Sequence, residues 1–192
     1  MRNIIIFSAI FVFGLALSAC AAPPTEEMSK AQDAVIMAES DADAVAYAGN
    51  TLIRARDALT RMQSEADAKR YDAAKNFAAE AVTYAEKAVA DGKTGAARAM
   101  DEAANLISGL SGPLAETSSA IDTAKKVQDI QLDFDSISQE MNLAQQTYDD
   151  ALQSFQTDDY KDVIDKGQTV RSMLSDINSE LSQAAMTTSR KQ

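Results

Sequence analysis

The sequence predicts an all-α fold built from antiparallel helical hairpins. Past Thr25, apolar residues recur every three or four positions, which is the period of one face of a helix. No stretch shows the strict alternation of apolar and polar residues that indicates a half-buried strand. Hydrophobic residues make up 46% of the chain and charged residues 24%, which is ordinary for a folded domain. We therefore expect an elongated helical bundle with coiled-coil-like seams.

The first helix is expected to begin immediately after Pro24. Thr25 is a suitable N-cap residue. The carboxylates of Glu26 and Glu27 would lie in the first turn, where the helix dipole favours negative charge. The buried stripe of this helix is predicted to be Met28, Ala31, Val35 and Ala38.

A turn within residues 40–50 leads into the predicted hairpin. Gly49-Asn50 is the stronger turn signal there and Ser40-Asp41 the weaker, because glycine weakens a helix interior. An alanine stripe lets a partner helix approach closely, so the next two helices should form an antiparallel hairpin with Tyr71 at its corner. Residues 25–92 then form a first hairpin unit. Its two stripes are Leu52, Ala55, Leu59, Met62 and Ala66, then Ala74, Ala78, Ala81, Ala85 and Ala88.

Two further turn signals follow this hairpin. Asp91-Gly92 is expected to end the third helix, because glycine is favoured just past a helix C-terminus. A shorter helix over residues 94–110 then reaches Gly112-Pro113, the clearest interior boundary in the chain. Residues 93–112 are therefore expected to form a connecting helix and turn.

From residue 113 the pattern repeats at an offset of 89 residues, which predicts two similar halves. Tyr71, for example, corresponds to Tyr160. Because the second hairpin unit, residues 113–185, lacks a matching glycine at its first turn, one long helix over residues 114–157 is an alternative to two shorter ones. The polar tail, residues 186–192, is expected to fray. The two predicted apolar stripes of the second unit are Met141, Ala144, Tyr148, Ala151 and Phe155, then Val163, Gly167, Val170, Leu174 and Ile177.

The first 19 residues have the three parts of an export signal. Arg2 supplies positive charge, residues 4–17 are apolar, and small residues precede Cys20. As a helix, this apolar run would be about 21 Å long. That is shorter than the roughly 30 Å hydrocarbon core of a bilayer, so a permanent span is not expected. Residues 1–19 are interpreted as a cleaved signal peptide.

Four residues surround the expected cleavage point: Leu17, Ser18, Ala19 and Cys20. They resemble the lipobox of bacterial lipoproteins at every position. The resemblance implies cleavage before Cys20, covalent diacylglycerol on its thiol and an N-acyl chain on the new amino terminus. Several acyl chains on one residue would anchor the chain stably to a membrane. Residues 20–24 would form a lipidated tether, and Ala21 favours sorting to the outer membrane, facing the periplasm.

Residues 20–100 combine a Pro-Pro start with an alanine-rich hairpin. The spacing is carried by Tyr47, Ala48, Leu52, Ala55, Ala58, Leu59, Tyr71, Ala74, Ala78, Ala81 and Ala85. These features resemble the lipoprotein family called domain of unknown function 4398. Members commonly have a proline after the Tyr-Ala pair, where this chain has Gly49. The resemblance implies an envelope lipoprotein with a helical hairpin, and it carries over no catalytic or binding residues.

The composition argues against several classes of function. Cys20 is the single cysteine and the chain has no histidine, which excludes disulfides within the chain, Cys/His zinc sites and catalytic triads. Without Arg2, which leaves with the signal peptide, 17 of the 18 basic residues remain, against 29 acidic residues. The mature chain would therefore be negatively charged, so nucleic acid is not expected as a partner. We expect no enzyme activity, no metal and no cofactor apart from the lipid on Cys20.

Short motifs that resemble ligand sites are incomplete. Gly92-Lys93-Thr94 resembles the end of a phosphate-binding loop, but Lys87 stands where the motif needs its first glycine. Asp41-Ala42-Asp43 resembles the start of a calcium loop without its later ligand and glycine, so capping is the better interpretation. The acidic pairs Asp149-Asp150 and Asp158-Asp159 are interpreted as solvated helix ends.

Three other side chains bear on function. Phe77 and Tyr84 lie beside the alanine seam, where internal packing is expected and contact with another helix is the alternative. Lys191 resembles the terminal lysine through which some lipoproteins join peptidoglycan, although Gln192 follows it.

The patterns together predict a non-enzymatic envelope lipoprotein that acts as a helical scaffold or protein-interaction module in the periplasm. The motivation is a set of packing seams without a reactive site. One alternative is a peptidoglycan-associated tether, motivated by Lys191. Another is a carrier of a small apolar ligand, motivated by the loosely filled alanine core of the first hairpin.

Overall fold

The computed structural model describes residues 22–128 and 130–189, which form helices joined by short connections. The helices are α1 (Thr25–Ser40), α2 (Ala42–Tyr47), α3 (Gly49–Asp67), α4 (Tyr71–Ala124), α5 (Phe134–Gln156) and α6 (Tyr160–Ser189). These residues contain no strand, so the predicted all-α class is confirmed. None of the helices described is long and apolar enough to cross a membrane.

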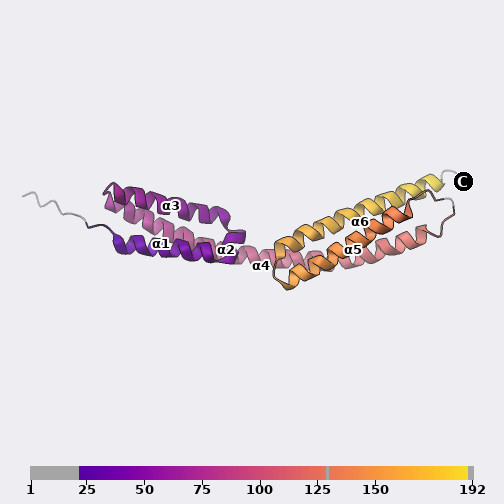
Figure 1. Cartoon of the computed structure of the whole chain (residues 1–192), viewed down its shortest axis with the longest axis horizontal. Coiled ribbons are helices and arrows are strands. Elements are labelled where there is room, and N and C mark those ends of the chain that lie inside the picture. Colours follow the sequence, from indigo (N-terminus) through magenta and orange to yellow (C-terminus); the bar gives the residue numbers. More distant parts are fainter. Residues whose placement is uncertain (1–21, 129, 190–192) are drawn as a thin grey trace, which may run out of the picture.

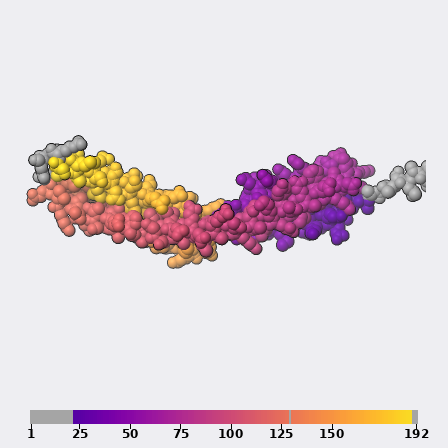
Figure 2. All heavy atoms as spheres, turned by 180° about the vertical axis from the view of Figure 1, so that it is seen from behind, coloured from indigo at the N-terminus to yellow at the C-terminus, as the bar shows by residue number. Residues whose placement is uncertain are grey.

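The helices form two units that share α4 (Figure 1). In the first unit, α1 and α2 follow one another along the N-terminal half of α4, and α3 packs beside them. In the second unit, the C-terminal half of α4 packs with α5 and α6. The molecule is a rod that narrows between the two units (Figure 2). We call the end of the rod beyond Ala124 the distal end.

The two units have different cores. Alanine dominates the first, and the predicted stripes are largely confirmed: the buried residues are Ala31, Val35, Ala38, Ala44, Ala48, Leu52, Ala55, Ala58, Met62, Ala78, Ala81, Ala85 and Ala88. Larger side chains fill the second unit in two clusters: Leu106, Leu110, Leu114, Ala144, Val170 and Leu174, then Ile121, Ile137, Ile177 and Leu181. Because the alanines are small, the helices of the first unit can pack at short distance.

The two hairpin turns have the same backbone geometry. Lys69 and Asp158, which stand 89 residues apart, adopt left-handed φ angles of 59° and 60°. In each turn the next N–H, that of Arg70 or Asp159, donates to the carbonyl five residues earlier. This is the Schellman pattern that satisfies the last carbonyls of a helix. The hairpins α3–α4 and α5–α6 are therefore structural repeats at the predicted offset, with Tyr71 at the first corner.

The start of the first unit differs from the expectation in two ways. Pro24 occupies the N-cap position of α1 without a side-chain hydrogen bond, so Thr25 is the first helical residue rather than the cap. The chain breaks twice instead of once, at Asp41 and at Ala48. The Asp41 carboxylate accepts a 2.8 Å hydrogen bond from the backbone N–H of Ala44, so capping of α2 is confirmed.

The expected boundaries at Gly92 and Gly112-Pro113 are wrong, because α4 continues through both. Gly92 is buried against α2, where a Cβ atom would lie 2.5 Å from the backbone nitrogen of Ala44. Gly92 therefore permits close packing of α2 on α4 and does not mark the end of a helix. Residues 93–112 are part of α4 rather than a separate connection.

Pro113 lies on the exposed side of α4, whereas Leu110 and Leu114 are buried in the core of the second unit. A helical proline lacks an N–H, and its ring crowds the carbonyl four residues earlier, which here belongs to Gly109. That residue is also exposed, so its carbonyl can turn toward water. Burial of the leucines outweighs the local cost, and the helix continues.

The alternative of one helix over residues 114–157 is wrong. The chain leaves the helix at Lys125, and α5 begins at Phe134, where the Asp133 carboxylate accepts hydrogen bonds from two N–H groups of the first turn. The predicted fraying of residues 186–192 is wrong for its first part, because α6 continues to Ser189 and Thr188 is buried. Residues 190–192 lie outside the described part.

Candidate functional site

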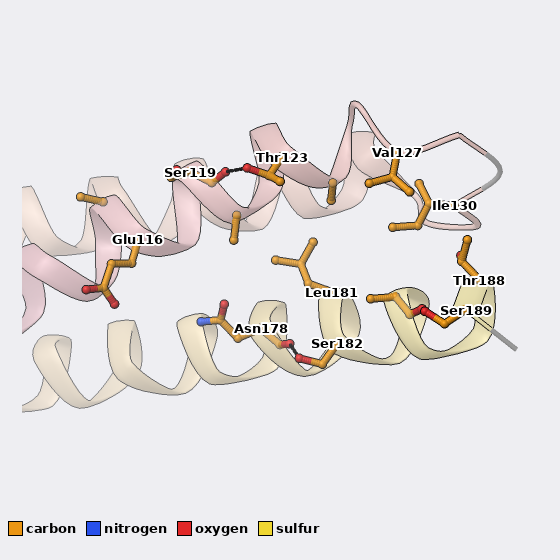
Figure 3. Close-up of a pocket in the computed structure, with 14 residues that line it drawn as sticks. Glu116, Ser119, Thr123, Val127, Ile130, Asn178, Leu181, Ser182, Thr188 and Ser189 are labelled. Atoms are coloured by element: carbon orange, nitrogen blue, oxygen red, sulfur yellow. Dashed lines mark hydrogen bonds between the residues drawn. The ribbon is translucent and has the colours of Figure 1, made fainter.

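A groove of about 980 Å³ runs between α4 and α6 at the distal end of the rod (Figure 3). We call it the distal groove. Its apolar lining includes Ala120, Ala124, Val127, Ile130, Leu181 and Ala185. Its polar lining includes Ser119, Thr123, Asn178, Ser182, Thr188 and Ser189. An open, mostly apolar concavity with a few polar groups is the usual form of a binding site.

The groove exists because small side chains on both helices leave the space between them unfilled. Ala120 and Ala124 face it from α4, and Ala185 faces it from α6. Leu181 extends from α6 toward α4 and belongs to the underlying core with Ile137 of α5 (Figure 3). No residue of α5 lines the groove. It therefore lies on a face of the α4–α6 pair that α5 leaves uncovered.

Asn178 organises the polar side of the groove. Its amide nitrogen donates to the hydroxyl oxygen of Thr117 at 2.8 Å and to the carbonyl of Leu174 at 2.7 Å. Thr117 is only 2% exposed, so this bond gives its buried hydroxyl a partner between α4 and α6. The hydroxyls of Thr123 and Ser182 donate to carbonyls four residues earlier in their own helices. These hydroxyl oxygens remain acceptors toward the groove.

The lining of the distal groove offers little reactive chemistry. Among the described residues that line it, Glu116 is the one ionisable side chain, and it is exposed. Within residues 22–128 and 130–189, no three His, Cys, Asp or Glu side chains gather as a potential metal site. The arrangement suits recognition of an apolar surface bordered by hydrogen-bond donors, by shape and burial.

The residues predicted to carry the lipid anchor, Leu17, Ser18, Ala19 and Cys20, lie outside the described residues, as does Lys191. Lipidation and the peptidoglycan link therefore stay predictions. The motif Gly92-Lys93-Thr94 lies inside α4, where its backbone N–H groups belong to the helix and form no loop.

Phe77 and Tyr84 pack internally, as expected. Both are partly buried against the core of the first unit. The guanidinium of Arg61 lies 5.8 Å from the ring centre of Phe77, and that of Arg54 lies 5.9 Å from the ring centre of Tyr84. Each arginine comes from α3, so the two cation–π pairs join α3 to α4.

The alanine core and the α3–α4 hairpin lie within residues 20–100, the segment whose alanine spacing predicts a family resemblance. Residues 26–104 match the domain of unknown function DUF4398. The DUF4398 match extends from α1 into the part of α4 that enters the second unit, and it confirms the resemblance predicted from the alanine spacing. The distal groove lies outside the DUF4398 match. No curated protein and no solved structure matches the chain.

Sequence reasoning did not identify the distal groove. Its two sides lie far apart in the chain, and their alignment depends on the length of α4 and the position of the α5–α6 turn. The available signal was compositional: Thr117-Ser118-Ser119 and Thr187-Thr188-Ser189 are polar runs in otherwise core-forming helices. Both runs contribute to the groove or to the hydrogen bonds that border it.

Proposed function

We propose that this chain is a membrane-anchored, non-enzymatic scaffold of the cell envelope that holds a protein-binding groove away from the membrane. The observation that carries the proposal is the continuity of α4. Its 54 residues run through both units. At 1.5 Å per residue, α4 is about 81 Å long. The described chain begins at one end of this rod and the groove lies at the other (Figure 1).

The proposed anchor is the lipid on Cys20. This residue precedes the described chain by two positions, so the lipid would attach at the end of the rod remote from the groove. Labelled palmitate should be incorporated by the full chain, and Cys20→Ser should abolish the label. Equal labelling of the Cys20→Ser protein would contradict the anchor.

The proposed partner is a protein that covers the distal groove in the periplasm. A photo-crosslinking residue at Ser182 or Ala185, which line the groove, should capture the partner in intact cells. Ser175 provides a matched control, because it is exposed on α6 two turns earlier and does not line the groove. Equal crosslinking at Ser175 and Ser182, or none at either groove position, would contradict the proposal.

The apolar lining of the groove also favours a second candidate function, the binding of a small apolar ligand. The alanine core of the first hairpin, which motivates a carrier, is shielded from solvent, with Ala55, Ala74 and Ala81 all 0% exposed. The distal groove is open and mostly apolar, so it is the proposed place for such a ligand. Native mass spectrometry of the purified full chain should detect bound lipid. A bulky Ala185→Trp substitution in the groove should displace this lipid. A wild-type spectrum without bound ligand would count against this function.

A further inference from the structure

The two units of the rod are joined by little besides α4. Among the described residues, α1, α2 and α3 have backbone neighbours in one another and in α4, and none in α5 or α6. Between the units, five of the six residues from Ala97 to Glu102 are exposed. The narrow middle of the rod in Figure 2 corresponds to this stretch. Gly92 and Gly95 lie just before it, and glycine is the least favourable residue in a helix interior after proline.

One side chain bridges the two units. Lys161, in the first turn of α6, donates a hydrogen bond from its ammonium group to the backbone carbonyl of Ala46 in α2. The same ammonium group lies 4.9 Å from the centre of the Tyr47 ring, in a cation–π contact. These partners belong to the C-terminal turn of α2, where the helix dipole places partial negative charge. Lys161 thus connects the two units across the place where they meet, which we call the joint.

The surroundings of Tyr47 reinforce this contact. Its Cβ atom lies where a side chain at Gly95 would stand, 2.5 Å from the Cβ position, so Tyr47 packs directly on α4. Burial, followed by the nearby carboxylates of Asp43 and Asp159, raises the pKa of the Tyr47 phenol. The two carboxylates come from α2 and from the α5–α6 turn, so negative charge from both units surrounds the place where the Lys161 ammonium lies.

We infer that Lys161 is a clasp between the two units and that it sets the direction in which the distal half of the rod points. With the clasp closed, the α5–α6 turn is held to the end of α2 and the rod keeps one bend. With it open, α4 alone connects the units and flexes at its exposed stretch. The function of the clasp is conformational and does not depend on what occupies the distal groove.

The clasp can be tested by measuring a distance across the joint. In the full-length chain carrying Cys20→Ser, spin labels at Thr60 of α3 and Ser175 of α6, both exposed, report the separation of the units by pulsed electron resonance. The unsubstituted joint should give one narrow distance distribution. Lys161→Ala should broaden it and lower the ratio of clasped to unclasped molecules by about fivefold to tenfold, the combined effect expected for an exposed cation–π contact and a charge at a helix C-terminus.

Matched variants separate the clasp from a general effect of charge or folding. Lys161→Arg retains a cationic donor and should keep the narrow distribution. Lys93→Ala removes an exposed lysine from α4 near the joint and should leave it unchanged. A second label pair within the second unit, at Gln146 and Ser175, should give the same distance in every variant. A Lys161→Ala distribution across the joint as narrow as the original, with the unit intact, would overturn the inference.

Discussion

At the scale of single residues, glycines that look alike in the sequence have opposite roles in α4. Gly92 is buried, and a Cβ atom there would lie 2.5 Å from the Ala44 nitrogen and 2.6 Å from the Asp43 carbonyl carbon. Both are backbone atoms, which cannot move away as the end of a flexible side chain can. Gly109 is exposed and has nothing within 4 Å of its Cβ position. The first glycine therefore permits helix packing, and the second only weakens the helix.

This difference predicts opposite effects for one substitution. Gly92→Ala should lower the free energy of unfolding by about 1–3 kcal/mol, because the added methyl group separates α2 from α4. Gly109→Ala should raise it by about 0.5–1 kcal/mol, because alanine is the better helix former and meets no neighbour. Urea denaturation followed by circular dichroism measures both. Stabilisation by Gly92→Ala would show that α2 does not pack on α4 as described.

At the scale of elements, the α5–α6 hairpin is held at its turn by a small polar network. The Asp162 carboxylate on α6 accepts hydrogen bonds from the ammonium of Lys166 and from the hydroxyl of Ser154 on α5. Lys166 also donates to the Ser154 hydroxyl at 3.1 Å. The hydrogen bond from Lys166, then that from Ser154, lowers the pKa of Asp162 below its ordinary value of 3.8, and Asp162 in turn raises the pKa of Lys166 above 10.5.

The two shifts define the pH range in which this network stabilises the hairpin. A lowered carboxyl pKa gives stability above pH 3.8 that is lost as the pH falls through the folded-state value. A raised lysine pKa gives stability below pH 10.5 that is lost as the pH rises through the folded-state value. Asp162→Asn should therefore lower the melting temperature slightly at pH 7 and have a smaller effect at pH 2.

The control for this measurement is Asp176→Asn. Asp176 is exposed on the same helix and forms no ion pair with the other residues that the structure describes. Its substitution should shift the melting temperature less than that of Asp162 at pH 7. Equal shifts for Asp162→Asn at both pH values would show that the carboxylate charge contributes nothing to the hairpin.

At the scale of the whole molecule, a helix shared by two units converts two small bundles into one rod. A straight rod as long as α4 alone, about 81 Å, has a radius of gyration of about 23 Å. A globular chain of 192 residues would have a radius of gyration of about 16 Å. Small-angle X-ray scattering of the monomeric Cys20→Ser protein should give about 23 Å or more. Light scattering during size exclusion supplies the molecular mass as a control. A radius of gyration near the globular value of about 16 Å would mean that α4 folds back on itself.

The sequence alone determined the helical class, the residues of the alanine seam and the α3–α4 hairpin with its corner at Tyr71. It also located the second hairpin through the offset of 89 residues. These features follow from the spacing of apolar residues, which acts over one or two helical turns and can be recognised without knowledge of distant contacts.

The tertiary structure decided that α4 continues past Gly92 and Gly112-Pro113, and that α4 and α6 leave a groove between them. Each of those turn signals carries a local cost of about 1–3 kcal/mol. Burial of residues such as Leu110 and Leu114, at about 1.5–3 kcal/mol for each fully buried leucine, can outweigh that cost. A local sequence pattern indicates the free-energy cost of continuing a helix through glycine or proline. The compensating burial depends on packing against helices that are distant in the chain.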